Sequence, residues 1–118
     1  MDKKRILLVD DDESIQLLYR EEFEDEGYTV ESAGNGVEAL VKFRQNPPDL
    51  VILDINMPGM NGIEVLRQMK ELRAQLPVIL CSAYQEYKQD FGSWASEAYV
   101  VKSANLDELK ATVRKHLT

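Results

Sequence analysis

The chain has 118 residues, the size of one domain, and we expect residues 1–118 to form a single domain with no room for a second module. Its apolar fraction of 44% is ordinary for a soluble protein, and no apolar run approaches the roughly 20 residues that cross a bilayer. Fourteen basic against 21 acidic residues give a formal charge of −7, which argues against direct binding to nucleic acid because a phosphate backbone needs a cationic face.

The amino terminus and the cysteine content indicate a location in the cytoplasm. The segment over residues 1–5 runs straight into an apolar strand, with no apolar signal region and no small-residue cleavage site. The single cysteine, Cys81, cannot form an internal disulfide, which agrees with a reducing compartment. Because Cys81 lies within an apolar run, we expect it to be an inert core residue.

The first part of the chain predicts a strand, a helix and a second strand. Residues 6–9 are continuously apolar and stop at Asp10, as a buried parallel strand does. Gly27 is placed to end the helix that follows, and residues 29–33 alternate as an outer strand does. The residues at helical spacing that define the apolar face of this helix are Ile15, Leu18, Tyr19 and Phe23.

The alternation of helix and strand continues to the end of the chain. A second helix has its apolar face at Val37, Leu40, Val41 and Phe43, and Pro47-Pro48 closes it because proline cannot continue a helix. The remaining predicted elements are strands over 50–54, 78–82 and 99–102, and helices over 63–72, 85–94 and 106–117, with a turn-rich loop over 57–62.

This order of elements predicts an α/β fold. Five strands joined by helices imply right-handed crossovers, a parallel sheet and helices on both faces. For five strands the flavodoxin-like order 2-1-3-4-5 fits best, so we predict a doubly wound sheet of that order. The first and third strands are then neighbours, and the crevice at their carboxyl ends, where such sheets bind ligands, should hold Asp10, Asp11 and Asp54.

Polar residues end four of the apolar runs and should converge at one edge of the sheet. Crowded carboxylates repel one another, and a cation relieves this; Mg²⁺ is the usual choice where phosphate is also present. Asp10 and Asp11 form a pair suited to holding the metal, whereas Asp54 stands alone on the central strand and is the candidate nucleophile toward phosphorus. Lys102 would neutralise a phosphoryl oxygen, and the Ser82 hydroxyl would donate a hydrogen bond to another.

Plainer roles compete with this interpretation. Acids before a helix cap its free N–H groups, and for Asp12 we favour that role; for Asp10 and Asp11 we favour the metal. Ser82 or Lys102 alone, at the end of a strand, is most simply a solvated terminus. The functional interpretation therefore depends on their coincidence with the acids at one edge.

Four segments match a known family in order and spacing. They are Ile6-Leu7-Leu8-Val9-Asp10-Asp11-Asp12, Asp54-Ile55-Asn56-Met57-Pro58-Gly59-Met60-Asn61-Gly62, Ser82-Ala83 and Tyr99-Val100-Val101-Lys102. Together they resemble the motifs of the receiver domain of two-component response regulators, and the likeness covers nearly the whole chain. The resemblance implies a signalling switch that catalyses its own phosphorylation and dephosphorylation without being a turnover enzyme.

The resemblance also implies a role for each matching position. Asp54 would be the phosphoacceptor. The metal would be held by Asp10, Asp11 and Asp54 and by the backbone carbonyl of Asn56. Lys102 would pair with the phosphoryl group, and Ser82 and Tyr99 would act as the switch residues. The implied phosphodonor is a phosphohistidine on a sensor histidine kinase or a phosphotransfer protein. The implied output is a shift in a two-state equilibrium, at the face of the fourth helix, fifth strand and fifth helix, that controls a downstream domain or protein; a phosphorylation-dependent dimer is left open.

Two departures from the family pattern leave one alternative open. Ser103 stands where the family usually has a proline in a cis bond, and a cis bond is far costlier without proline. The interval from Ser82 to Lys102 is shorter than usual, which predicts a fourth helix that is shortened or broken near Gly92. The alternative is a receiver-shaped interaction module that does not need phosphate.

Two enzyme or carrier classes of similar topology fit less well. In a flavodoxin-like electron carrier, three acids after the first strand would repel the flavin phosphate. A phosphatase of the haloacid dehalogenase type needs an acid two positions after its nucleophile, and that position is Asn56.

Overall fold

The computed structural model describes residues 3–55, 62–82, 98–102 and 105–117. The predicted helix over 85–94, with Gly92, lies outside these residues, as do Asn56 and Ser103. None of the described helices is both long enough and apolar enough to cross a membrane. The described elements are β1 (Arg5–Val9), α1 (Glu13–Asp25), β2 (Thr29–Ala33), α2 (Gly36–Gln45), β3 (Leu50–Asp54), α3 (Gly62–Leu72), β4 (Val78–Ser82), β5 (Ala98–Val101) and α5 (Asp107–Leu117).

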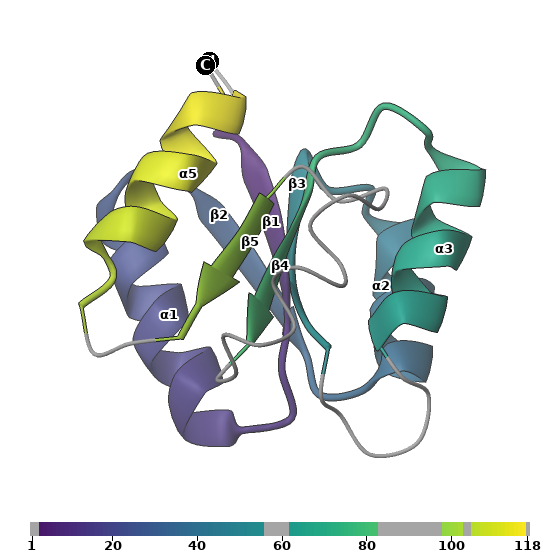
Figure 1. The fold of residues 1–118 in the computed structure, drawn as a ribbon, viewed down its shortest axis with the longest axis horizontal. Coiled ribbons are helices and arrows are strands. Elements are labelled where there is room, and N and C mark those ends of the chain that lie inside the picture. The colour runs from purple at the N-terminus through teal and green to yellow at the C-terminus, as the bar shows by residue number, and fades with distance from the viewer. Residues whose placement is uncertain (1–2, 56–61, 83–97, 103–104, 118) are drawn as a thin grey trace.

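The five strands form one parallel sheet in the order β2-β1-β3-β4-β5, so the predicted doubly wound fold is confirmed. Helices α1 and α5 cover one face of the sheet, and α2 and α3 cover the other (Figure 1). The register pairs Val9 with Leu53 and Asp54 with Cys81. The carboxyl ends of β1, β3 and β4 therefore lie beside one another.

Alternate residues of each strand enter two separate hydrophobic clusters, because successive side chains of a strand point to opposite faces. Leu7, Val9 and Leu53 pack in the cluster beneath α2 and α3. Leu8 and Ile52 pack in the cluster beneath α1 and α5. Every residue of β3 and β4 is buried, which explains why their sequences are continuously apolar rather than alternating.

Both ends of α1 follow from the local sequence. The Asp12 side chain accepts hydrogen bonds from the backbone N–H groups of Ser14 and Ile15, at 2.8 and 3.3 Å, so the predicted capping role is confirmed. At the other end Gly27 has a φ of +99°, which favours glycine, and its N–H donates to the carbonyl of Glu24. This geometry turns the chain into β2.

The predicted apolar faces of α1 and α2 were wrong at three positions. The exposed fractions of Leu18, Val37 and Val41 are 45, 62 and 45%. A sheet covers only a stripe of each helix, and in these helices the stripe is centred on residues such as Tyr19 and Phe43, which are buried. Helical spacing identifies the face but not the edge of the stripe.

Candidate functional site

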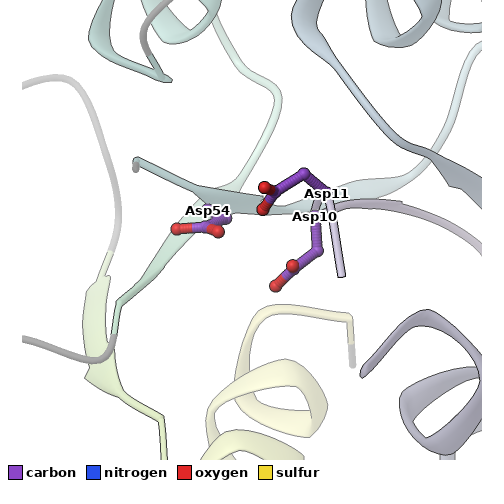
Figure 2. Close-up of side chains that lie close together, drawn as sticks. All are labelled: Asp10, Asp11 and Asp54. Atoms are coloured by element: carbon purple, nitrogen blue, oxygen red, sulfur yellow. The ribbon is translucent and has the colours of Figure 1, made fainter. Parts of the chain in front are cut away.

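Three carboxylates meet at the carboxyl ends of β1 and β3. Asp10 and Asp11 directly follow β1, and Asp54 is the last residue of β3, its neighbour in the sheet. One carboxylate oxygen from each lies within 4.8 Å of the others, and Figure 2 shows the three side chains gathered at adjacent strand ends. The structure thus brings together the three acids that the topology predicted to converge.

The three acids differ in exposure. Asp10 and Asp54 are 2 and 4% exposed, whereas Asp11 is exposed. The backbone N–H of Asp12 donates to Asp10 Oδ1 at 2.9 Å, and the N–H of Asp10 donates to the carbonyl of Ala33 at 3.0 Å. Asp10 is therefore fixed in place, while Asp11 lies where a ligand from solvent can reach it.

Lys102 supplies a cation to this cluster from the end of β5. Its Nζ lies 2.6 Å from Asp10 Oδ2 and 3.2 Å from Asp54 Oδ2, and its backbone N–H donates to the carbonyl of Ser82 at 2.7 Å. Burial by itself would lower the pKa of Lys102, but the hydrogen bond to Asp10 and the charges of Asp10 and Asp54 outweigh it and raise that pKa. The Lys102 side chain therefore stays protonated at neutral pH. The sequence did not indicate its pairing with Asp10.

Ser82 and Tyr99 lie on the neighbouring strands β4 and β5, and both are buried. Ser82 ends β4, is fully buried and directly follows Cys81, the register partner of Asp54. Tyr99 pairs with Leu80 and is 6% exposed within the cluster beneath α2 and α3.

Tyr19 and Cys81 lie close beneath the acid cluster. The sequence did not indicate that Tyr19 would lie near these acids. Burial raises the pKa of the Cys81 thiol to about 12; Lys102 opposes this, and Asp10 and Asp54 add to it. Burial also raises the pKa of Tyr19, which interacts with Cys81 and feels the charges of Lys102 and Asp10. Both groups stay neutral at ordinary pH and support the cluster without adding charge.

The donor set fits a small, hard divalent cation. Three carboxylates face one ammonium, so negative charge is in excess at the cluster. Ligand oxygens on an octahedral Mg²⁺ lie about 3 to 4 Å apart. Since one oxygen from each acid already lies within 4.8 Å of the others, small side-chain rotations bring them into that range.

A doubly wound sheet with an acid cluster and a lysine at its carboxyl edge fits a signalling module that is controlled by phosphorylation. The chain belongs to the response regulator receiver domain family, whose family model matches residues 6–114.

Curated relatives include both a protein of similar length and longer regulators. The chain is 38% identical over 119 residues to sporulation initiation phosphotransferase F of Bacillus subtilis, covering 99% of this chain and 96% of that protein. It is 37% identical to the regulatory protein AtoC of Escherichia coli, covering 96% of this chain but 25% of AtoC. It also matches the transcriptional regulatory protein PhoP of Bacillus subtilis at 35% identity, covering 94% of this chain and 47% of PhoP.

Solved structures agree with this assignment. Response regulator TrrA from Thermotoga maritima, in complex with Mg²⁺-BeF, is 50% identical, with a TM-score of 0.92 over 97% of this chain and 99% of TrrA. A second structure, of histidine kinase ThkA in complex with TrrA, matches with a TM-score of 0.90 and 50% identity, covering 98% of this chain and 99% of the matched chain.

Proposed function

We propose that this receiver domain accepts a phosphoryl group on Asp54 in a Mg²⁺-dependent reaction and thereby controls a downstream partner. The observation that carries the proposal is the meeting of Asp10, Asp11 and Asp54 within 4.8 Å, beside the ammonium of Lys102. The TrrA structures support it, since TrrA is seen both with Mg²⁺-BeF and with a histidine kinase.

The metal would be held by the side chains of Asp10, Asp11 and Asp54 and by the backbone carbonyl of Asn56. Asn56 itself lies outside the described residues, so its part is the one that the likeness to receiver domains implies. When bound, Mg²⁺ neutralises charge on the phosphoryl oxygens and on the attacking carboxylate. Asp11 is suited to direct ligation because it is exposed to solvent.

In the chemical step, a carboxylate oxygen of Asp54 attacks phosphorus and forms a new P–O bond. With a phosphohistidine donor the P–N bond breaks, and the imidazole nitrogen leaves with the bonding pair and takes up a proton. Lys102 begins 3.2 Å from Asp54 Oδ2 and can pair with a phosphoryl oxygen. Before the reaction its raised pKa keeps the proton on Nζ, so Lys102 enters the step as an ammonium.

We propose that the response to phosphorylation begins at Ser82. Its hydroxyl donates a hydrogen bond to the phosphoryl group, and Tyr99 changes rotamer as Ser82 moves. The Tyr99 side chain packs on the α2 and α3 side of the sheet, whereas its strand, β5, also contacts α5. The movement would therefore be transmitted through β5 to α5. A ligand-dependent population shift of this kind needs only a differential affinity for the two states.

The proposed partners are a sensor histidine kinase or phosphotransfer protein and a downstream output domain or protein. We place the reaction in the cytoplasm and treat residues 1–118 as one domain that modifies itself rather than turning over substrate. The matches to AtoC and PhoP support an output partner, because this chain spans 25 and 47% of those proteins.

Acetyl phosphate tests the proposal without a kinase, because attack by Asp54 on phosphorus then releases acetate. With Mg²⁺, intact mass spectrometry should show a gain of one phosphoryl group in the native chain and none in Asp54→Asn. No gain in the native chain, or an equal gain in Asp54→Asn, contradicts the assignment of Asp54.

A beryllofluoride mimic separates this function from the phosphate-independent interaction module. We expect beryllofluoride with Mg²⁺ to shift backbone amide resonances of β4, β5 and α5 in the native chain. Unchanged amide spectra would favour the interaction module.

A further inference from the structure

Gln16, in the second turn of α1, reaches back to the acid cluster. Its side-chain Nε2 donates a hydrogen bond of 2.6 Å to the backbone carbonyl of Asp10, and the contact is partly buried. That carbonyl belongs to the peptide that joins Asp10 to Asp11. A helix side chain therefore holds the peptide between the two adjacent acids.

The other polar groups of Asp10 are held from different directions. Its N–H donates to Ala33, its Oδ1 accepts from the backbone of Asp12, and its Oδ2 pairs with Lys102. These contacts fix the backbone N–H and the carboxylate of Asp10. Among the described residues, it is Gln16 that donates to the Asp10 carbonyl, and this carbonyl sets the plane of the peptide leading into Asp11.

The orientation of this peptide matters most for Asp11. An exposed side chain is little constrained by packing, so its direction depends on its own backbone. The Asp11 carboxylate has to stay within ligand distance of that of Asp54, which lies on another strand. A peptide free to rotate would spread the Asp11 carboxylate over more positions and add an entropic cost to metal binding.

We infer that Gln16 is a positioning residue for the metal site: by holding the Asp10–Asp11 peptide, it keeps the Asp11 carboxylate aimed toward Asp54. The inference rests on the proposed function, because it concerns the same cation.

Gln16→Met tests the inference, because methionine keeps the length of the side chain and removes the donor. Gln68→Met is the matched control: Gln68, on α3, also makes a side-chain hydrogen bond, to Glu64. Mg²⁺ titrations followed by amide NMR should give a dissociation constant about three- to tenfold weaker for Gln16→Met, the usual range for loss of one hydrogen bond, and an unchanged value for Gln68→Met.

Two further readouts separate positioning from a merely structural role. The acetyl phosphate reaction of Gln16→Met should be slow at low Mg²⁺ and recover at saturating Mg²⁺, because the reacting groups are intact. In the metal-free protein the Asp11 amide resonance should shift in Gln16→Met, since it belongs to the peptide that Gln16 holds.

An affinity for Mg²⁺ in Gln16→Met equal to that of the native chain would overturn the inference and leave the proposed function standing. A native chain that binds no Mg²⁺ would refute the proposed function itself. If Gln16→Met does not fold, the native metal-free protein decides: slow hydrogen exchange of the Gln16 side-chain amide relative to exposed Gln45 supports the inference, and equal exchange overturns it.

Discussion

At the scale of single residues, we expect the charge of Asp11 to lower the free energy of unfolding in the metal-free protein. Asp11 is exposed, and its carboxylate lies near those of Asp10 and Asp54. In EDTA we expect Asp11→Asn to raise the melting temperature by about 2 to 4 °C, since it removes like-charge repulsion. In excess Mg²⁺ the order should reverse, because binding at about 100 times the dissociation constant stabilises the native chain by about 2.7 kcal/mol. Calorimetry in both buffers checks this, and the same order in both would contradict it.

Gly62 fixes the backbone at Asp54 by close approach. A Cβ added at Gly62 would lie 2.5 Å from Ile55 Cα and 2.7 Å from the Asp54 carbonyl oxygen, and neither backbone atom can move aside cheaply. We expect Gly62→Ala to cost at least about 2 kcal/mol in urea unfolding and to lower the rate of phosphorylation, because the end of β3 must shift.

Gly34→Ala is the control for Gly62→Ala. Its added Cβ would meet Gln16 Nε2 at an ordinary 3.5 Å. We therefore expect only a small change in the free energy of unfolding, and equal costs for the two substitutions would show that crowding at Asp54 is not the cause.

Cys81 should be chemically silent in the native chain. Burial raises its pKa to about 12, so at pH 8 the thiol is essentially un-ionised. We expect thiol labelling at pH 8 to proceed only through unfolding and to accelerate sharply in urea. An unfolded thiol ionises near pH 8.5, so this group lowers native stability as pH rises from about 8.5 to 12. Fast labelling of the native chain would contradict the burial of the thiol.

At the scale of the element, α1 starts at Asp12, which caps the helix and adjoins the acid cluster. Its capping role can be tested separately from a role in binding the metal. Asp12→Ala should cost about 1 kcal/mol in urea unfolding, since it leaves the N–H groups of Ser14 and Ile15 without their acceptor. Asp12→Ser should recover most of that loss. Mg²⁺ affinity, measured by NMR titration, should stay within about twofold of the native value in both variants. A large loss of affinity in Asp12→Ser would instead make Asp12 a ligand.

At the scale of the whole molecule, the two hydrophobic clusters share the same five strands. Losing the helices on one face exposes strands that the other cluster also needs. We therefore expect a single unfolding transition in which far-UV and near-UV circular dichroism coincide. Two separated transitions would show that the faces unfold independently.

The sequence predicted the sheet well because all five strands carry a local signal. Four runs are continuously apolar, since helices cover both faces of the sheet, and each ends at the polar residue that the structure places at the carboxyl edge. The strand order followed from the rule for doubly wound sheets, and the convergence of Asp10, Asp11 and Asp54 followed from the order.

What the sequence missed depends on three-dimensional detail. Leu18 and Val37 have helical spacing, yet the sheet covers only the centre of each helix and leaves them exposed. The pairing of Lys102 with Asp10 depends on the reach of a long side chain across two intervening strands. Gln16 belongs to no recognisable motif, because its role is a hydrogen bond to a backbone carbonyl, and every residue has such a carbonyl.

The position of each group across the sheet has a mechanical consequence. Asp10 and Asp54 come from β1 and β3, which have neighbours on both sides, whereas Lys102 follows β5, which ends the strand order. The other edge strand, β2, carries none of Asp10, Asp54 and Lys102, whereas Lys102, at the end of β5, is paired with Asp54. We therefore expect a bulky dianion on Asp54 to displace β5 and α5 more than β2, and a partner that senses it to bind there.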